Sequence, residues 1–207
     1  MENNITLAFD TCLDKMYVVL KKDDSILTSK VIENTQTHYH SAYLISTIAD
    51  ILNENNIKPE DITLIGINIG PGSFTGIRAC TTVARVFAQA SGCKAVGVSS
   101  LEILSKITDC KNPMVALDAR KNKAYLYIDN EIKGAVELEE VQKLAESGNY
   151  TVITDDRLKP LLGGISYQQK DYPLGEILIS LAEEKIKTTD GDWHKLLPLY
   201  IQPPPMG

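Results

Sequence analysis

A glycine-rich turn, Gly70 to Arg78, is the segment of this sequence best suited to hold an anion. It reads Gly-Pro-Gly-Ser-Phe-Thr-Gly-Ile-Arg and joins an apolar run that predicts a buried strand (62–69) to a predicted helix (74–91). Glycines let the main chain approach a neighbour closely, and the start of a helix directs N–H groups outward. The turn therefore suits either a phosphate group or tight packing between two subunits. Its spacing matches neither the Walker A loop nor the Gly-x-Gly-x-x-Gly fingerprint.

Two aspartates, Asp10 and Asp118, follow the first predicted strand in each half of the chain. Mg²⁺ prefers hard oxygen ligands, so Asp10, Thr11 and Asp118 define a possible relict nucleotide site with a hydrated ion. Aspartates at strand ends also make turn hydrogen bonds, and this alternative stays open.

The histidines and cysteines do not form a metal motif. His38 and His40 are two residues apart, whereas metal-binding helices place histidines four apart. The four cysteines include no Cys-x-x-Cys pair, which predicts reduced thiols in an intracellular compartment. We expect no metal, no cofactor and no catalytic nucleophile.

Alternating strand and helix patterns must position these residues. In the first half, strands are expected at 5–9, 16–20, 26–32, 62–69 and 95–98, with helices at 41–53 and 74–91. In the second half, strands are expected at 114–117, 123–128, 132–137 and 150–154, with helices at 138–147 and 177–186.

The second half begins like the first. The order Asp, Lys, Tyr recurs at the same offsets, as Asp10, Lys15, Tyr17 and Asp118, Lys123, Tyr125. Three hairpin-linked strands followed by α/β crossovers indicate a mixed sheet. We therefore predict an α/β, duplicated actin-like (ASKHA or RNase H-like) fold with two lobes, 1–108 and 109–207. The second lobe is expected to be degenerate, because 156–173 lacks a clear second crossover.

Charge and hydropathy limit the partners. The chain has 207 residues with 21 basic and 27 acidic side chains, a net charge of −6. Such a chain is a poor binder of nucleic acid on its own, so any RNA role is expected to pass through a partner. It shows no signal peptide and no apolar run long enough to cross a membrane, which predicts a soluble, cytoplasmic protein.

The predicted helix at 74–91 is apolar around most of its circumference, with a narrow polar strip that includes Arg78 and Arg85. Such a helix is usually buried on two sides. It is either a central core helix or one that docks onto a partner.

The run Ile65 to Arg78 closely resembles the signature of the bacterial TsaB (YeaZ) family. Further matches are Leu7 to Thr11, His40-Ser41, Gly97 to Glu102, Asp118 to Arg120 and the tail Pro198 to Ile201. The resemblance is continuous to about residue 128. It implies the actin-like fold and a role in making threonylcarbamoyladenosine beside the tRNA anticodon.

The resemblance also implies partners. The family member is a non-catalytic scaffold or activator subunit that binds the catalytic subunit TsaD, is joined by the ATPase TsaE, and forms homodimers through helices 41–53 and 74–90. It would meet tRNA only through this complex. The His-x-x-x-His pair of the catalytic relative is missing here. The residues expected at the partner or dimer interface are Leu44, Ile48, Ile51, Phe74, Ile77, Arg78, Thr81 and Arg85.

Two alternatives of other classes remain. One is an active nucleotide-dependent actin-like enzyme that uses Asp10 and Asp118 with Mg²⁺. The other, metallopeptidase activity, rests on fold analogy alone.

Overall fold

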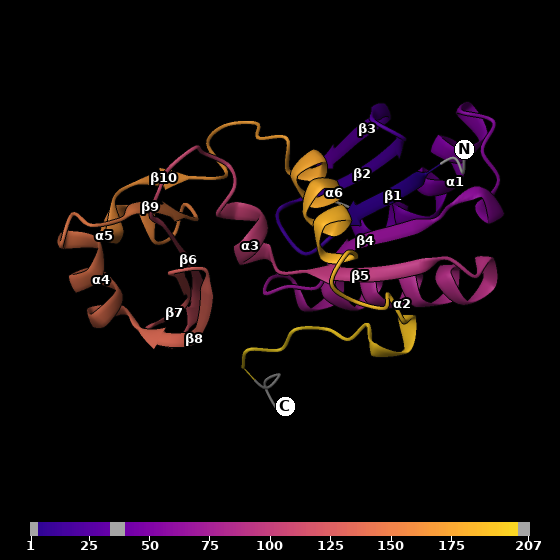
Figure 1. The fold of residues 1–207 in the computed structure, drawn as a ribbon. Helices are drawn as coiled ribbons and strands as arrows, with labels where there is room; N and C mark the ends of the chain where they lie inside the picture. Colours follow the sequence, from indigo (N-terminus) through magenta and orange to yellow (C-terminus); the bar gives the residue numbers. More distant parts are fainter. Residues whose placement is uncertain (1–3, 34–39, 203–207) are drawn as a thin grey trace. The chain divides into compact units, whose positions relative to one another are not determined.

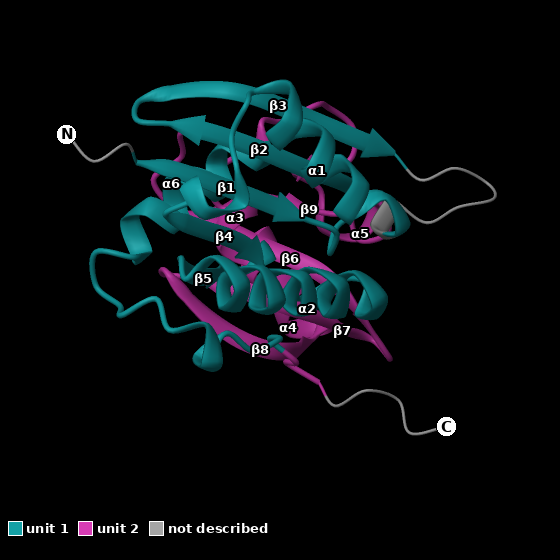
Figure 2. Cartoon of the chain, turned by 90° about the vertical axis from the view of Figure 1, so that its right-hand side faces the viewer, with its two compact units in different colours: residues 1–100, 174–199 teal, residues 101–173, 200–207 magenta. Residues whose placement is uncertain are grey.

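The computed structural model describes residues 4–33 and 40–202 and divides the chain into two compact units. Unit 1 contains Met1–Ser100 and Leu174–Leu199, and unit 2 contains Leu101–Pro173 and Tyr200–Gly207 (Figure 2). Each unit has its own sheet and its own core, and each is described separately.

Unit 1 is built on a five-stranded mixed sheet with the order β3-β2-β1-β4-β5 (Figure 1). Its strands are β1 (Ile5–Asp10), β2 (Lys15–Lys22), β3 (Ser25–Glu33), β4 (Leu64–Asn68) and β5 (Lys94–Val98). The β1–β2 and β2–β3 pairs are antiparallel, whereas β4 pairs in parallel with both β1 and β5. The carboxyl ends of β1 and β4 therefore meet at one edge of the sheet, where Asp10 and the glycine-rich turn lie.

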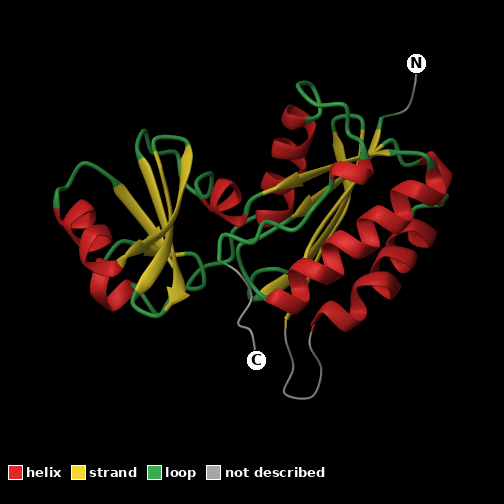
Figure 3. Cartoon of the chain, turned by 90° about the horizontal axis from the view of Figure 1, so that it is seen from below, coloured by secondary structure: helices red, strands yellow, loops and turns green. Residues whose placement is uncertain are grey.

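Helices cover both faces of this sheet (Figure 3): α1 (Leu44–Glu54) and α2 (Phe74–Ser91) on one face, α6 (Leu174–Lys185) on the other. Alternate residues of a strand face opposite sides. Leu7, Phe9 and Ile65 join one hydrophobic cluster with the buried residues of α1 and α2. On the opposite face Gly66 lies against Ala182, where an added Cβ would come within 2.5 Å of the alanine methyl.

Unit 2 repeats this topology in the order β10-β9-β6-β7-β8. Its strands are β6 (Pro113–Arg120), β7 (Lys123–Ile128), β8 (Glu131–Glu137), β9 (Thr151–Thr154) and β10 (Ile165–Ser166). Its helices are α3 (Ser100–Leu104), α4 (Leu138–Glu146) and α5 (Lys159–Leu162). The last crossover of unit 2 runs from β9 through α5 to β10. It is much shorter than the β4–α2–β5 crossover of unit 1, because α5 has four residues and β10 has two. The predicted duplicated actin-like fold is confirmed.

Several boundaries differ from the prediction. The first expected helix starts with a 3-10 turn, η1 (His40–Tyr43), before α1 begins. Further 3-10 turns are η2 (Pro59–Asp61) and η3 (Trp193–Lys195). The contiguous lobes 1–108 and 109–207 do not describe the division, because α6 returns to pack on the sheet of unit 1 and the first break falls after Ser100. The segment 156–173 contains α5 and β10.

No helix within the described ranges is both long enough and apolar enough to span a lipid bilayer.

Candidate functional site

The glycine-rich turn packs against the turn between β1 and β2. A Cβ added at Gly76 would lie 2.6 Å from the carbonyl carbon of Thr11, and closer still to its oxygen. A Cβ at Gly72 would lie 2.9 Å from the carbonyl carbon of Cys12. The Ser73 N–H donates to the Cys12 carbonyl at 2.7 Å. The glycines thus permit close packing inside one unit, a use that neither sequence-based alternative had named.

The β1–β2 turn uses its own polar groups internally. The Thr11 N–H donates to Cys80 Sγ at 3.1 Å, and the Thr11 hydroxyl donates to the Gly76 carbonyl at 2.8 Å. The Cys12 N–H donates to Asp10 Oδ1 at 2.6 Å. A phosphate bound here would need such N–H groups directed toward it. This arrangement favours a structural turn over an anion site.

Asp10 is part of a buried polar network. Asp10 is only 2% exposed, and its Oδ2 accepts a hydrogen bond from Asn68 Nδ2 at 2.9 Å. Asn68 Oδ1 in turn accepts from the Gly70 N–H at 2.8 Å and from the Ser100 hydroxyl at 2.9 Å. Mg²⁺ usually keeps several of its waters. A residue this buried, with both oxygens engaged, does not fit a hydrated ion, and the turn-bonding alternative is favoured.

Asp118 lies in unit 2 and is paired with arginines. Its Oδ2 lies 3.1 Å from Arg157 Nη1 and 3.6 Å from Arg120 Nε, and its Oδ1 accepts from the Arg120 N–H. Its own N–H donates to Asp155 Oδ2 at 2.7 Å. Burial, followed by the Asp118 charge, raises the pKa of Tyr125. Two arginine side chains already pair with this carboxylate, which weakens the case for it as a magnesium ligand.

Five of the eight predicted interface residues lie in the core of unit 1, so their burial does not support the role that the prediction gave them. They are Leu44, Ile48, Ile51, Ile77 and Thr81. The first four line the side of each helix that packs on the sheet. Their regular spacing is the stripe that the sheet buries, so their side chains are not at the surface of the unit.

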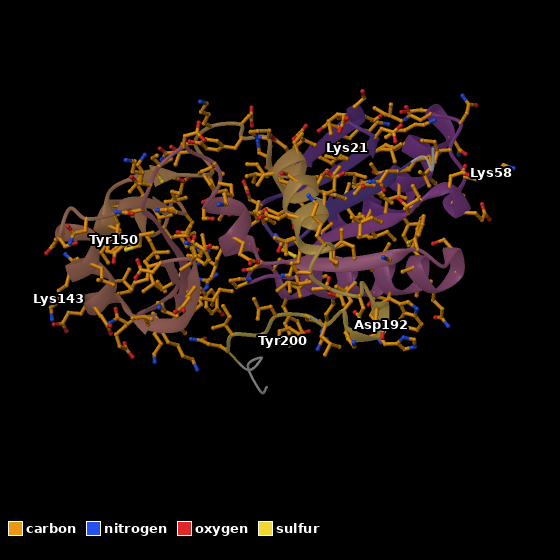
Figure 4. The ribbon with its side chains drawn as sticks, viewed as in Figure 1. Lys21, Lys58, Lys143, Tyr150, Asp192 and Tyr200 are labelled. Carbon is orange, nitrogen blue, oxygen red and sulfur yellow. The ribbon has the colours of Figure 1, made fainter. Side chains whose placement is uncertain are left out.

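The other three predicted residues lie nearer the surface. Arg78 is exposed, and its guanidinium carbon lies 3.9 Å from the centre of the Phe74 ring. Arg85 is partly buried, 5.7 Å from the centre of the Trp193 ring. Trp193 belongs to η3, and Figure 4 labels the preceding residue, Asp192.

The outer sides of α1 and α2 carry apolar side chains that the sequence reading did not select. Ile45 is 68% exposed and Val86 is 61% exposed, the two highest fractions among the large apolar side chains described. Tyr43 and Phe74 are also exposed. We define Tyr43, Ile45, Phe74 and Val86 as the outer apolar surface of unit 1. Ile45 and Val86 lie outside the core stripe of their helices. A large apolar residue in such a position is the signal that could have found them.

The comparisons with known proteins all point to proteins of tRNA threonylcarbamoyladenosine biosynthesis. The family model described as TsaD, tRNA N6-adenosine threonylcarbamoyltransferase, matches residues 26–150, more than half of the chain. A Bacillus subtilis protein named tRNA threonylcarbamoyladenosine biosynthesis protein TsaB is 27% identical over 121 residues, which cover 58% of this chain and 52% of that protein. The chain belongs to the family that this model describes, and the curated relatives show its similarity to TsaB (YeaZ) proteins. The TsaB protein of Buchnera aphidicola is 26% identical over 129 residues, or 59% of this chain and 56% of the relative.

Solved structures agree on the fold. YeaZ from Pseudomonas aeruginosa superposes with a TM-score of 0.75 at 22% identity, over 95% of this chain and 99% of that chain. The chain spans about half the length of the curated TsaB relatives it matches. The predicted TsaB resemblance is confirmed.

The TsaB signature now has a structural meaning. Gly72 and Gly76 of the signature support the β1–β2 turn, and Asn68, just before them, holds Asp10. The sequence reading missed Asn68 and Arg157 because each acts on a residue far away along the chain. Of the two histidines weighed as metal ligands, His38 lies outside the described residues and His40 begins η1.

Proposed function

We propose that this TsaB-family chain takes part in tRNA threonylcarbamoyladenosine biosynthesis as a non-catalytic scaffold or activator subunit. Its partner is a TsaD-type catalytic subunit, which binds the outer apolar surface of unit 1. Support for the pathway comes from the names of the matched relatives, which include tRNA N6-adenosine threonylcarbamoyltransferases of Streptococcus pneumoniae at 27% identity over 115 residues.

The observation that carries the docking proposal is the exposure of Ile45 and Val86 on α1 and α2. Both helices already cover the sheet with their inner sides, so these outer side chains add nothing to the core. Exposed apolar side chains on the outer sides of two helices are candidates for an interaction surface. At the start of α2 the Phe74 ring, with the Arg78 guanidinium over it, adds an aromatic and a cationic group. Aromatic residues and arginine are enriched at protein interfaces.

The non-catalytic role rests on Asp10 and Asp118. One is buried in a hydrogen-bonded network and the other is held by two arginines, so neither offers the open carboxylate that a nucleotide-bound ion needs. Catalysis is therefore assigned to the partner. The net charge of −6 supports contact with tRNA through that partner.

Two further interactions belong to the same proposal. A TsaE-type ATPase joins the assembly, and in the absence of TsaD the chain pairs with a second copy of itself. Self-association through the outer apolar surface would compete with TsaD for Ile45 and Val86.

Calorimetric titration of the chain into the TsaD-type subunit of the same organism tests the docking surface. Val86→Asp removes apolar area worth about 1–2 kcal/mol and buries a carboxylate, so binding should weaken about 50-fold or more. Because Val86 is exposed, the free variant should keep its stability within about 0.5 kcal/mol. Tyr43→Ala should show a smaller loss.

Leu161→Asp is the matched control. Leu161 is an exposed apolar residue of α5 in unit 2, at 43% exposure, and its replacement should leave binding and tRNA modification unchanged. If Val86→Asp binds as tightly as the wild type and supports the same amount of modified tRNA, the outer apolar surface is not the docking site.

A further inference from the structure

Two buried thiols meet beneath the glycine-rich turn. Cys12 lies in the β1–β2 turn and Cys80 lies on α2, and neither is more than 2% exposed. Their Sγ atoms and a carboxylate oxygen of Asp10 all lie within 4.8 Å of one another. The proposed function uses neither thiol.

The contacts around this pair distinguish a dithiol from a metal site. Both Asp10 oxygens accept hydrogen bonds, from the Cys12 N–H and from Asn68 Nδ2. A metal ion would have to break these bonds to recruit Asp10 as its third ligand. Forming a disulfide would cost the thiols fewer hydrogen bonds. Cys12 Sγ would lose a weak hydrogen bond that it donates to the Asn68 carbonyl at 3.2 Å. Cys80 Sγ accepts the Thr11 N–H, and a disulfide sulfur can still accept it.

We propose that Cys12 and Cys80 form a reversible disulfide that ties the β1–β2 turn to α2. The oxidant is a small disulfide of the oxidised-glutathione class, RSSR. One protein thiolate attacks RSSR, which breaks its S–S bond, forms a mixed disulfide and releases one RS⁻. The second thiolate attacks the mixed disulfide, forms the Cys12–Cys80 bond and releases the other RS⁻. The two protons from the protein thiols convert these anions to two RSH.

The surroundings set the rate of this reaction. Burial is the main cause that raises the pKa of the Cys12 thiol well above its ordinary value, and Cys80 and Asp10 raise it further. A neutral, buried thiol is inert, so the pair stays reduced while the turn is packed. Oxidation needs local opening, in which the first turn of α2 lifts from Thr11 and Cys12. Once formed, the bond prevents that opening.

The bond would also constrain the unfolded chain. The two cysteines are 68 positions apart, so the closed loop is long. Closing such a loop lowers the entropy of the unfolded state, and the oxidised chain should melt roughly 5–10 °C higher than the reduced chain.

The test uses the full-length wild-type chain. Reduced protein is incubated with oxidised glutathione at pH 8.5 in urea below the unfolding transition, which promotes local opening without global unfolding. Free thiols are then blocked, the chain is digested without reduction, and the peptides are identified by mass spectrometry. We expect the Cys12 and Cys80 thiols to disappear together, one Cys12–Cys80 cross-linked peptide, and a rise in melting temperature that a reductant reverses.

Variants separate this bond from other thiol chemistry. Cys12→Ser and Cys80→Ser should each abolish the cross-link and the rise in melting temperature, whereas Cys93→Ser, which removes another buried thiol, should keep both. The proposal is overturned by four free thiols after this treatment, by stable glutathione adducts on Cys12 or Cys80, or by a cross-linked chain that melts lower than the reduced one. None of these outcomes depends on the TsaD-type partner.

Discussion

Replacing Gly76 with alanine should destabilise unit 1 severely, although alanine favours helices. A Cβ at this position would lie 2.6 Å from the carbonyl carbon of Thr11 and 3.2 Å from the Cys12 nitrogen. These are main-chain atoms, so they cannot rotate away as a side chain would. Overpacking of this kind costs about 3 kcal/mol, at the upper end of the usual range.

Two smaller contributions adjust this cost. Displacing the Thr11 turn weakens the hydrogen bond from its hydroxyl to the Gly76 carbonyl, which is worth about 1 kcal/mol. Alanine recovers up to about 1 kcal/mol through its higher helix propensity. The net loss is about 3 kcal/mol, or more than a hundredfold in the folding equilibrium constant.

Urea unfolding followed by tryptophan fluorescence measures this loss of stability in unit 1. Trp193 is the only tryptophan in the sequence, belongs to unit 1 and packs against its core. Gly92→Ala is the control, because Gly92 has a φ of 74° but open space where a Cβ would stand. It should cost about 1 kcal/mol from backbone strain alone. A Gly76→Ala chain as stable as the wild type would refute the close packing of the two turns.

Two other predictions concern the buried network and its pH dependence. Asp10→Asn places an amide where the Cys12 N–H and the Asn68 amide both donate, so the new NH₂ group faces a donor. The free energy of unfolding should fall by about 2–3 kcal/mol in denaturant titrations. Full stability with lost Mg²⁺–ATP binding would instead support the nucleotide-enzyme alternative. The raised pKa of Cys12 means that the unfolded thiol ionises first as pH rises above about 9. Relative to Cys12→Ser, the wild type should therefore lose about 1.4 kcal/mol per pH unit above that point, and an unfolding free-energy difference that stays constant from pH 8 to 10.5 would contradict this.

The repeated hairpins made the architecture predictable. Asp10 ends β1 and Asp118 lies two residues before the end of β6, and both sheets have the same strand order. The two turns that follow nevertheless differ. β1 ends at Asp10, five residues before β2 begins at Lys15. β6 instead continues to Arg120, and β7 begins at Lys123 after a tight turn in which Lys121 and neighbouring residues have positive φ. The sequence offsets match there while the strand register shifts, because a bulge lies between Asp118 and Arg120.

The interface prediction selected core residues for an identifiable reason. A stripe such as Leu44, Ile48 and Ile51 shows that a helix has an apolar side, but it does not say what covers that side. The sheet of unit 1 covers it, so the informative residues are those outside the stripe, Ile45 and Val86.

Contacts between distant residues were not predictable at all. The Arg157–Asp118 pair, the approach of Gly76 to Thr11 and the return of α6 to unit 1 all depend on the completed fold. Local patterns specify elements, whereas these contacts follow from how the elements pack.

Hydrogen exchange of the chain, alone and with the TsaD-type subunit, tests the docking claim most directly. Each segment reports its own protection, so the bound surface is located without any mutation. The account predicts slower exchange on binding in peptides that cover 43–54 and 74–91, with peptides of α4 and β8 unchanged. Protection confined to unit 2, with α1 and α2 exchanging as in the free chain, would contradict it.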